Sequence, residues 1–234
     1  MAEKRKIGLF GGTFNPIHLG HLRGAEEVRE RCGLHEVIFI PAASPPHKDT
    51  RHILEGHHRL EMVKLATQGN HSFSASAVEL ERPGKSFSVD TLRYFRERYE
   101  DSFFFILGRD AFLEIETWKD YQDLFSLCHF IVMIGDGIGG LPLADQLPKA
   151  LVPSFQYASE ARRWVHRSGH TLCFQEIHFL DISSTRIRDL LGKGQSAKYL
   201  IEAGVEGYIE RNGLYRKEPG GGSFGYKPSL TDGG

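Results

Sequence analysis

The strongest constraint on the fold is a pair of adjacent glycines that ends a short apolar run. Ile7–Phe10 is apolar, stops at Gly11-Gly12, and is followed after Pro16 by residues with helical spacing. Because glycine lacks a Cβ, it lets the backbone turn tightly and approach a ligand closely. The pattern therefore predicts a buried strand, a tight turn and a helix, with Gly33 as the left-handed cap of that helix.

Strand-like and helix-like segments alternate along the rest of the chain. Further strands are expected at Val37–Ile40, Phe73–Val78, Phe103–Leu107, Phe130–Ile134 and within Thr171–Ile182. Further helices are expected at His58–Thr67, Val89–Tyr99, Ser184–Leu191 and Val205–Arg211, with Ser88 as the N-cap of the second. This alternation predicts an α/β fold with a Rossmann-like, doubly wound parallel sheet. We expect a single domain over residues 1–216 with a C-terminal helical part, and a disordered tail over residues 217–234, which lack periodicity.

Charge and composition exclude several classes of protein. The 234 residues carry a formal net charge of −1, so duplex nucleic acid is not an expected partner and an anionic ligand must meet a local site. Three cysteines lie far apart without a Cys-x-x-Cys motif, which favours a reducing compartment. No apolar run is long enough for a membrane span or a signal peptide. We therefore predict a soluble cytoplasmic protein.

The start of the first helix carries two histidines, His18 and His21, with Gly20 between them. Residues three apart lie on one side of a helix, and a helix N-terminus presents free N–H groups to an anion. Imidazoles can donate hydrogen bonds to phosphoryl oxygens and gain a positive charge if protonated, while Gly20 avoids a side chain that would crowd a phosphate. The segment has neither a Gly-x-Gly-x-x-Gly fingerprint nor a P-loop lysine. Two histidines alone could be ordinary helix residues, but the Gly-Gly turn before them favours a phosphate site.

A second candidate segment, Ile182–Arg188, also follows an apolar strand and opens a helix. Ser183 and Ser184 bring hydroxyls to the positive end of that helix. Arg188, four residues after Ser184, shares its helix face and can bind phosphate through two hydrogen bonds. On its own the segment is equally consistent with a capped helix followed by a solvated basic turn.

Taken together, the His-x-Gly-His and Ile-Ser-Ser-Thr-x-x-Arg motifs resemble those of the nucleotidyltransferase superfamily. The ordered chain is similar to bacterial nicotinate-nucleotide adenylyltransferases, which form deamido-NAD. The resemblance also covers Gly11–Pro16, Pro45–Lys48, Ser86–Leu92, Ile106–Phe112, Trp118 with Tyr121, and Gly213–Tyr215.

The resemblance implies a role for each matching residue. His18, His21 and Arg188 are expected to contact the ATP phosphates as catalytic residues, and Trp118 is expected to stack on a nicotinate ring. The other ATP-binding residues implied are Gly11, Gly12, Thr13, Phe14, Lys48, Gly108, Asp110, Ile182, Ser183 and Ser184. The acceptor-binding residues implied are Thr13, Asn15, Ser86, Phe87, Ser88 and Trp118.

Two positions depart from the family pattern. The family commonly has an Arg-Pro-Gly-like turn where this chain reads Ile134-Gly135-Asp136-Gly137, so a basic contact is missing there or supplied elsewhere. Arg109 stands where the family often has a small residue, and it either lies away from the ligand or adds a phosphate contact. Neither departure involves His18 or His21.

The expected reaction transfers AMP from ATP to nicotinate mononucleotide. Mg²⁺ is expected with the triphosphate, and no protein metal site is expected, because His47, His52, His57 and His58 match no zinc spacing. ATP and nicotinate mononucleotide are the expected partners, and the resemblance leaves a homo-oligomer open. Alternative acceptors are nicotinamide mononucleotide and pantetheine phosphate, although Ser86–Leu92 and Trp118 favour a pyridine ring. A Rossmann-type binding module is a further alternative, which the missing glycine fingerprint and the histidine pair disfavour.

Overall fold

A computed structural model describes residues 4–43, 53–135 and 146–216. Lys48, the Pro45–Lys48 motif and the tail expected after residue 216 lie outside these ranges. The strands are β1 (Lys6–Gly12), β2 (Glu36–Pro41), β3 (Phe73–Ala75), β4 (Ser102–Gly108), β5 (His129–Ile134), β6 (Phe155–Ala158), β7 (Arg163–His166) and β8 (Thr171–Glu176). The helices are α1 (Leu19–Cys32), α2 (Gly56–Thr67), α3 (Ser88–Arg98), α4 (Arg109–Leu113), α5 (Tyr121–Leu127), α6 (Ser184–Gly192) and α7 (Ala203–Arg211). Short 3₁₀ turns are η2 (Ile115–Thr117) and η4 (Val152–Ser154).

The strands form one sheet of eight in the order β3-β2-β1-β4-β5-β8-β7-β6. All neighbours from β3 to β8 are parallel, whereas β7 is antiparallel to both β8 and β6. The chain leaves β1 toward β2 and β3 on one side, then returns through α3 to β4 on the other side. The carboxyl ends of β1 and β4 therefore meet where the strand order reverses, which is where open α/β sheets bind ligands.

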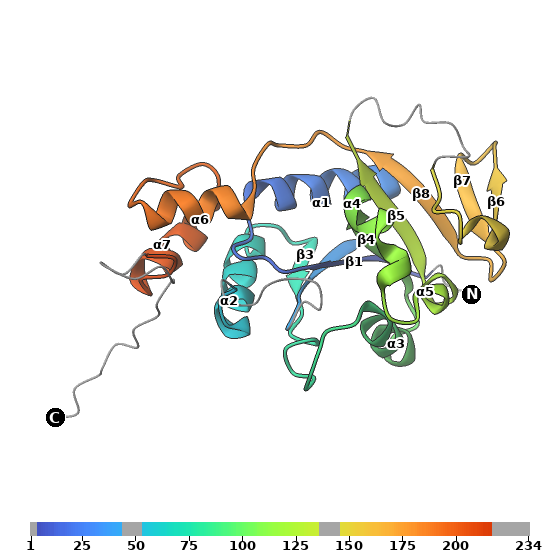
Figure 1. Ribbon diagram of the computed structural model, residues 1–234, viewed down its shortest axis with the longest axis horizontal. Helices are drawn as coiled ribbons and strands as arrows, with labels where there is room; N and C mark the ends of the chain where they lie inside the picture. The colour runs from blue at the N-terminus through green and yellow to red at the C-terminus, as the bar shows by residue number, and fades with distance from the viewer. Residues whose placement is uncertain (1–3, 44–52, 136–145, 217–234) are drawn as a thin grey trace.

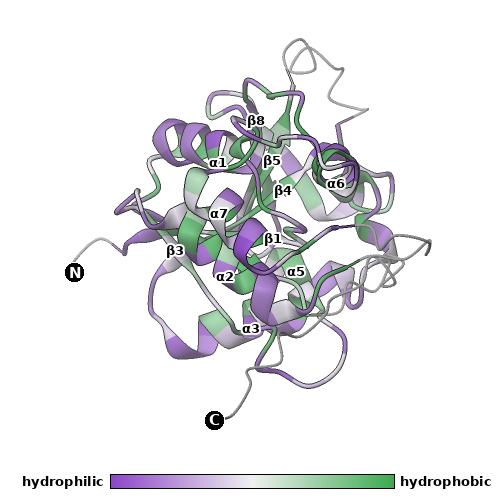
Figure 2. Cartoon of the chain, turned by 90° about the vertical axis from the view of Figure 1, so that its left-hand side faces the viewer, coloured by the Kyte–Doolittle hydropathy of each residue, from purple (hydrophilic) through white to green (hydrophobic). Residues whose placement is uncertain are grey.

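Each face of the sheet is covered by its own apolar core. One core joins Ile7 and Leu9 of β1 to helices α3, α4 and α5. The other joins Phe10 of β1 to α1, α2, α6 and α7. Helices α6 and α7 lie at the opposite end of the molecule from the β6–β7 hairpin (Figure 1). The central strands are mostly hydrophobic in colour, whereas α1 is mostly hydrophilic (Figure 2). This confirms the α/β fold and its C-terminal helical part.

Three details of the predicted fold were wrong. The sheet is mixed and not fully parallel, because the β6–β7 hairpin adds two antiparallel strands. This hairpin was not predicted, since its four-residue strands are too short to produce a readable periodicity. Strand β3 ends at Ala75 and not at residue 78, since Ser76 Oγ accepts a hydrogen bond from the Val78 N–H and a turn begins there. Ser88 is the first residue of α3 and not its cap: Phe87 occupies that position without a side-chain bond. The short helices α4 and α5 had not been expected.

Candidate active site

The two predicted histidines lie against each other at the start of α1. His18 is the N-cap residue, with an extended backbone, and its ring stacks on that of His21 with centroids 3.6 Å apart. The His18 N–H donates a 3.2 Å hydrogen bond to His21 Nδ1. Because Nδ1 accepts this bond, a neutral His21 carries its proton on Nε2 and can donate only from there.

Burial determines the charge of His18. The residue is 7% exposed, and desolvation lowers the pKa of its imidazole to about 4. At neutral pH the free enzyme therefore has an uncharged His18 that can donate one hydrogen bond. Glycine is needed at position 20 to make room for the His18 ring, because a Cβ there would lie 3.0 Å from His18 Nδ1. The expected reason had been room for a phosphate.

The second motif is bonded directly to the first loop. Ser184 Oγ donates a 2.8 Å hydrogen bond to the Pro16 carbonyl, and Arg188 Nη1 donates a 2.8 Å bond to the Asn15 carbonyl. Arg188 Nη2 also donates to Thr185 Oγ1 at 3.2 Å. These bonds bring the N-terminus of α6 to the N-terminus of α1, so two positive helix ends point to one place.

A cleft of about 660 Å³ lies between these segments, and we call it the histidine cleft. It is lined by Phe10, Thr13, Phe14, Asn15, His18, Gly20, His21, Gly24, Ile53, Met133, Ile177, Phe179, Leu180, Ile182, Ser183, Ser184, Thr185 and Arg188. No carboxylate is among these lining residues, while Arg188 and the two helix ends favour an anion. The cleft gathers most of the residues expected around the ATP phosphates, together with Asn15, which was expected on the acceptor side.

A second cavity of about 290 Å³, the tryptophan pocket, lies at the carboxyl ends of β1 and β4. It is lined by Phe10, Gly11, Gly12, Thr13, Ile40, Ala42, Glu79, Ser86, Phe87, Ser88, Thr91, Phe105, Ile106, Leu107, Gly108, Ala111, Glu114, Trp118 and Lys119. Phe10 and Thr13 line both cavities, so the two compartments share a wall. Gly11, Gly12 and Gly108, expected on the ATP side, line this pocket instead.

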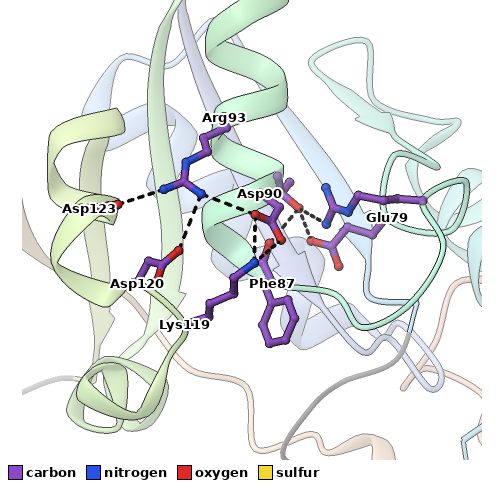
Figure 3. Close-up of polar contacts among 9 residues, drawn as sticks. Glu79, Phe87, Asp90, Arg93, Lys119, Asp120 and Asp123 are labelled. Carbon is purple, nitrogen blue, oxygen red and sulfur yellow. Dashed lines mark hydrogen bonds and ion pairs between the residues drawn. The ribbon is translucent and has the colours of Figure 1, made fainter.

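One wall of the tryptophan pocket contains a buried acid that the sequence analysis had missed. Glu79 is 7% exposed, and its Oε1 accepts a 2.7 Å hydrogen bond from Thr91 Oγ1 (Figure 3). Burial raises the pKa of the Glu79 carboxyl, opposed by hydrogen bonds from Thr91 and Ser86. Ser86 Oγ also accepts a 2.8 Å bond from the Ala43 N–H. The Ser86 hydroxyl therefore already accepts a bond from Ala43 and donates one to Glu79.

Trp118 follows η2 and is half-buried. Its ring makes an edge contact with the ring of Phe105, with centroids 6.2 Å apart. The next residue anchors this segment, because Lys119 Nζ lies 3.2 Å from an Asp90 carboxylate oxygen and 4.8 Å from the centre of the Phe87 ring. Arg93 extends the network: its guanidinium contacts Asp90, Asp120 and Asp123 (Figure 3). The network ties the Trp118 segment to the first turn of α3, beside the pocket.

Asp110, a predicted site residue, and Arg109, a departure from the family pattern, lie elsewhere. Asp110 is exposed and lines neither the histidine cleft nor the tryptophan pocket. Arg109 lines a different cavity, with Arg31 and Arg162, and lines neither the histidine cleft nor the tryptophan pocket. The apolar wall residues Met133, Ile177 and Leu180 were also missed, because an apolar residue near a strand end or in the segment after it carries no local functional signal.

The match to known proteins agrees with this geometry. The cytidylyltransferase-like family matches residues 9–190, a span that includes both motifs. The fold and the site thus define a nucleotidyltransferase, and the chain belongs to the cytidylyltransferase-like family.

Curated relatives narrow this assignment. The chain is 46% identical over 211 residues to a protein of Geobacter sulfurreducens and 45% identical over 214 residues to one of Syntrophotalea carbinolica. These alignments cover 90% and 91% of this chain and 98% of each relative, and both relatives are named probable nicotinate-nucleotide adenylyltransferase. Within its family the chain belongs to the nicotinate-nucleotide adenylyltransferases.

Solved structures support the fold. The chain superposes on Plasmodium falciparum nicotinic acid mononucleotide adenylyltransferase complexed with NaAD with a TM-score of 0.67. This match has 20% sequence identity and covers 90% of this chain and 97% of that one. The same protein complexed with APC gives a TM-score of 0.65 at the same identity and coverage. In the described ranges, no helix combines the length and apolarity that crossing a bilayer requires.

Proposed function

We infer that the chain transfers AMP from ATP to nicotinate mononucleotide, with ATP in the histidine cleft and the acceptor in the tryptophan pocket. The observation that carries this assignment is the wall shared by the two cavities, formed by Phe10 and Thr13. Reacting groups held in adjoining compartments meet at their junction. A transfer between two separately bound nucleotides requires this arrangement.

In the proposed reaction, a 5′-phosphate oxygen of the acceptor attacks the α-phosphorus of ATP in line with the leaving group. The new P–O bond forms as the α–β phosphoanhydride bond breaks, and the electron pair of that bond leaves with pyrophosphate. No side chain acts as a nucleophile, so catalysis consists of positioning and charge stabilisation. His18, Arg188 and the Nε2–H of His21 donate to phosphoryl oxygens, and Ser183 and Ser184 support the N-terminus of α6.

Mg²⁺ is proposed to accompany the triphosphate and to neutralise charge on its oxygens. The described lining of the histidine cleft fits this role, because it offers no carboxylate and leaves the ion to phosphate oxygens and water. The described ranges contain no group of three or more His, Cys, Asp or Glu side chains that could hold a metal.

In the tryptophan pocket, Trp118 is proposed to stack on the pyridine ring of the acceptor. Backbone N–H groups at the start of α3, near Ser88, would face the carboxylate of the ring. The first N–H groups of a helix have no partner within the helix, and the helix end favours an anion. The Ser86 hydroxyl has a supporting role in this proposal, because it already bonds within the protein.

The deciding experiment measures pyrophosphate release from ATP with a panel of acceptors. Nicotinate mononucleotide, nicotinamide mononucleotide and pantetheine phosphate are each supplied with Mg²⁺. We expect the first to be by far the best, and pyrophosphate release with none of them would refute the proposal. Because the attack is direct, no labelled adenylyl-enzyme should survive denaturation after incubation with ATP alone. Recovery of such a species would contradict the single-step mechanism.

A further inference from the structure

The largest fully buried side chain of the described structure is a cation that neither motif contains. Arg59 lies in the first turns of α2 and has an exposed fraction of 0%. Among the described residues its guanidinium donates only to backbone carbonyls: Nε to Leu54 at 2.8 Å, Nη1 to Thr13 at 2.8 Å and Nη2 to Ala43 at 3.3 Å. One side chain thus joins three separate stretches of backbone.

Each of these stretches forms part of the candidate active site or is bonded to it. Thr13 stands in the wall shared by both cavities. The Leu54 N–H donates to Asn15 Oδ1 at 3.3 Å, and Asn15 lines the histidine cleft. The Ala43 N–H donates to Ser86 Oγ at 2.8 Å, and Ser86 lines the tryptophan pocket. Leu54 and Ala43 are therefore each held at both N–H and C=O, with Arg59 on the carbonyl side.

The cost of burying this charge indicates that its geometry matters. Desolvation lowers the pKa of Arg59, and within the described ranges no carboxylate lies within ion-pair distance. The Glu79 carboxylate favours the charged form of Arg59 at longer range only. A buried cation without an ion pair is costly, and an apolar side chain would fill the same space more cheaply. A planar guanidinium can, however, hold several acceptors at fixed angles, which neither an ammonium nor an apolar group can do.

We propose that Arg59 is a positioning residue that sets the placement of the histidine cleft relative to the tryptophan pocket. It fixes the Thr13 carbonyl at their shared wall and ties the Asn15 side to the Ser86 side. Each substrate can still bind in its own compartment without this link. The alignment of the acceptor oxygen with the α-phosphorus needs both compartments in register, and a misplacement of about 1 Å can cost about 10²-fold in rate. This inference rests on the proposed assignment of ATP and acceptor to the two cavities.

The test compares Arg59→Lys and Arg59→Met with Met62→Ala. Met62 is equally buried on the same helix but belongs to the apolar core, so it controls for a loss of packing. For each variant, kcat, the melting temperature and two separate dissociation constants are measured. Calorimetry gives both dissociation constants. One is for nicotinate mononucleotide, and the other is for an ATP analogue that cannot react because a methylene group joins its α and β phosphorus atoms.

Both Arg59 variants should lose at least about 10-fold in kcat, while each dissociation constant changes by less than about threefold. Met62→Ala should lower the melting temperature and keep kcat within about twofold of the wild type, since it removes only core packing. A third variant, Arg59→Ala, is used for chemical rescue: guanidinium ion at millimolar concentration should restore part of its kcat, and methylammonium should not.

Several results would overturn the proposal. One is a kcat within twofold of the wild type in a folded Arg59→Lys or Arg59→Met variant. Another is a kcat in Met62→Ala that falls as far as it does in the Arg59 variants, in step with a lower melting temperature. Failure of both Arg59 variants to fold while Met62→Ala folds would reduce Arg59 to a structural role. If the wild type released no pyrophosphate with any acceptor, the proposed function itself would be refuted, independently of the Arg59 variants.

Discussion

The Tyr215 hydroxyl donates a 2.8 Å hydrogen bond to Asn15 Oδ1, although the two residues are 200 positions apart in the chain. Both side chains are buried, at 2% and 4% exposure. The same Asn15 accepts a hydrogen bond from Arg188 through its carbonyl oxygen. The end of the described chain therefore packs against the wall of the histidine cleft. This contact explains how the closing Gly213-Leu214-Tyr215 segment contributes to the site.

The hydrogen bond between Tyr215 and Asn15 leads to a prediction about which C-terminal truncations the protein tolerates. Tyr215→Phe should lower the free energy of unfolding by about 1 kcal/mol, the typical worth of one hydrogen bond. Truncation after Arg216 keeps the bond and should leave melting temperature and kcat unaltered, because residues 217–234 contain too little apolar surface to offset their ordering entropy. Truncation after Asn212 should lower both. A clear loss from the first truncation would show that the tail docks on the domain.

His18 is predicted to act in the transition state. His18→Ala should lower kcat by about 10²-fold or more, the scale of removing one preorganised donor, and change the KM for ATP much less. His18→Gln provides a matched variant, because its amide can donate a hydrogen bond from a similar position. We expect an intermediate kcat for it. Unchanged turnover in His18→Ala would remove this residue from the mechanism.

Acceptor choice is predicted to depend on charge at the start of α3. A carboxylate suits a site made of N–H donors, whereas a carboxamide turns its own NH₂ group toward them. The kcat/KM for nicotinate mononucleotide should therefore exceed that for nicotinamide mononucleotide by at least about 10²-fold. Comparable values would refute the carboxylate site. A preference for the amide would point instead to the Glu79 carboxyl as the group facing the ring substituent.

Trp118 is predicted to bind the ring without selecting its substituent. Both pyridine rings stack similarly, so Trp118→Ala should raise the KM for both acceptors and leave the acid-to-amide ratio near its original value. Trp164→Phe is the matched control, because Trp164 lies in the β6–β7 hairpin and its indole donates to Gln146. It should leave both KM values unchanged. A large change in the ratio in Trp118→Ala would assign selectivity to this residue.

Stability is predicted to fall as the solution is acidified. Burial lowers the pKa of both His18 and His129 to about 4, whereas an unfolded histidine titrates near 6.5. Between these values the unfolded chain binds protons that the folded chain does not, so the free energy of unfolding decreases as pH falls from about 6.5 to 4, by at most about 3 kcal/mol per residue. Above pH 7 these groups should cause no slope.

Urea denaturation at pH 7.5, 6.0 and 5.0 measures this effect. The His129→Asn variant should show a shallower slope, because it removes one buried imidazole and keeps an acceptor for the Thr171 N–H, which bonds His129 Nδ1 at 3.0 Å. His58, His166 and His170 have pKa values shifted in the same direction and should account for part of the remaining slope. A stability that is constant or rises toward pH 5 would contradict the prediction.

The sequence by itself determined the features that arise within a few residues of chain. The apolar run before Gly11-Gly12 became β1, and Gly33 caps α1 in the left-handed region with a φ of 63°. The three-residue spacing of His18 and His21 placed their rings on one side of a helix start. Such features are encoded locally because backbone sterics and helix periodicity act over one or two turns.

Only the tertiary structure decided what depends on segments far apart in the chain. It placed Asn15 between Tyr215 and Arg188, buried Arg59 among three carbonyls, and put Glu79 into the wall of a pocket. It also made His18 neutral, since its pKa depends on the desolvation that packing imposes. None of these properties has a local pattern, because burial and long-range hydrogen bonds exist only after distant segments have packed together.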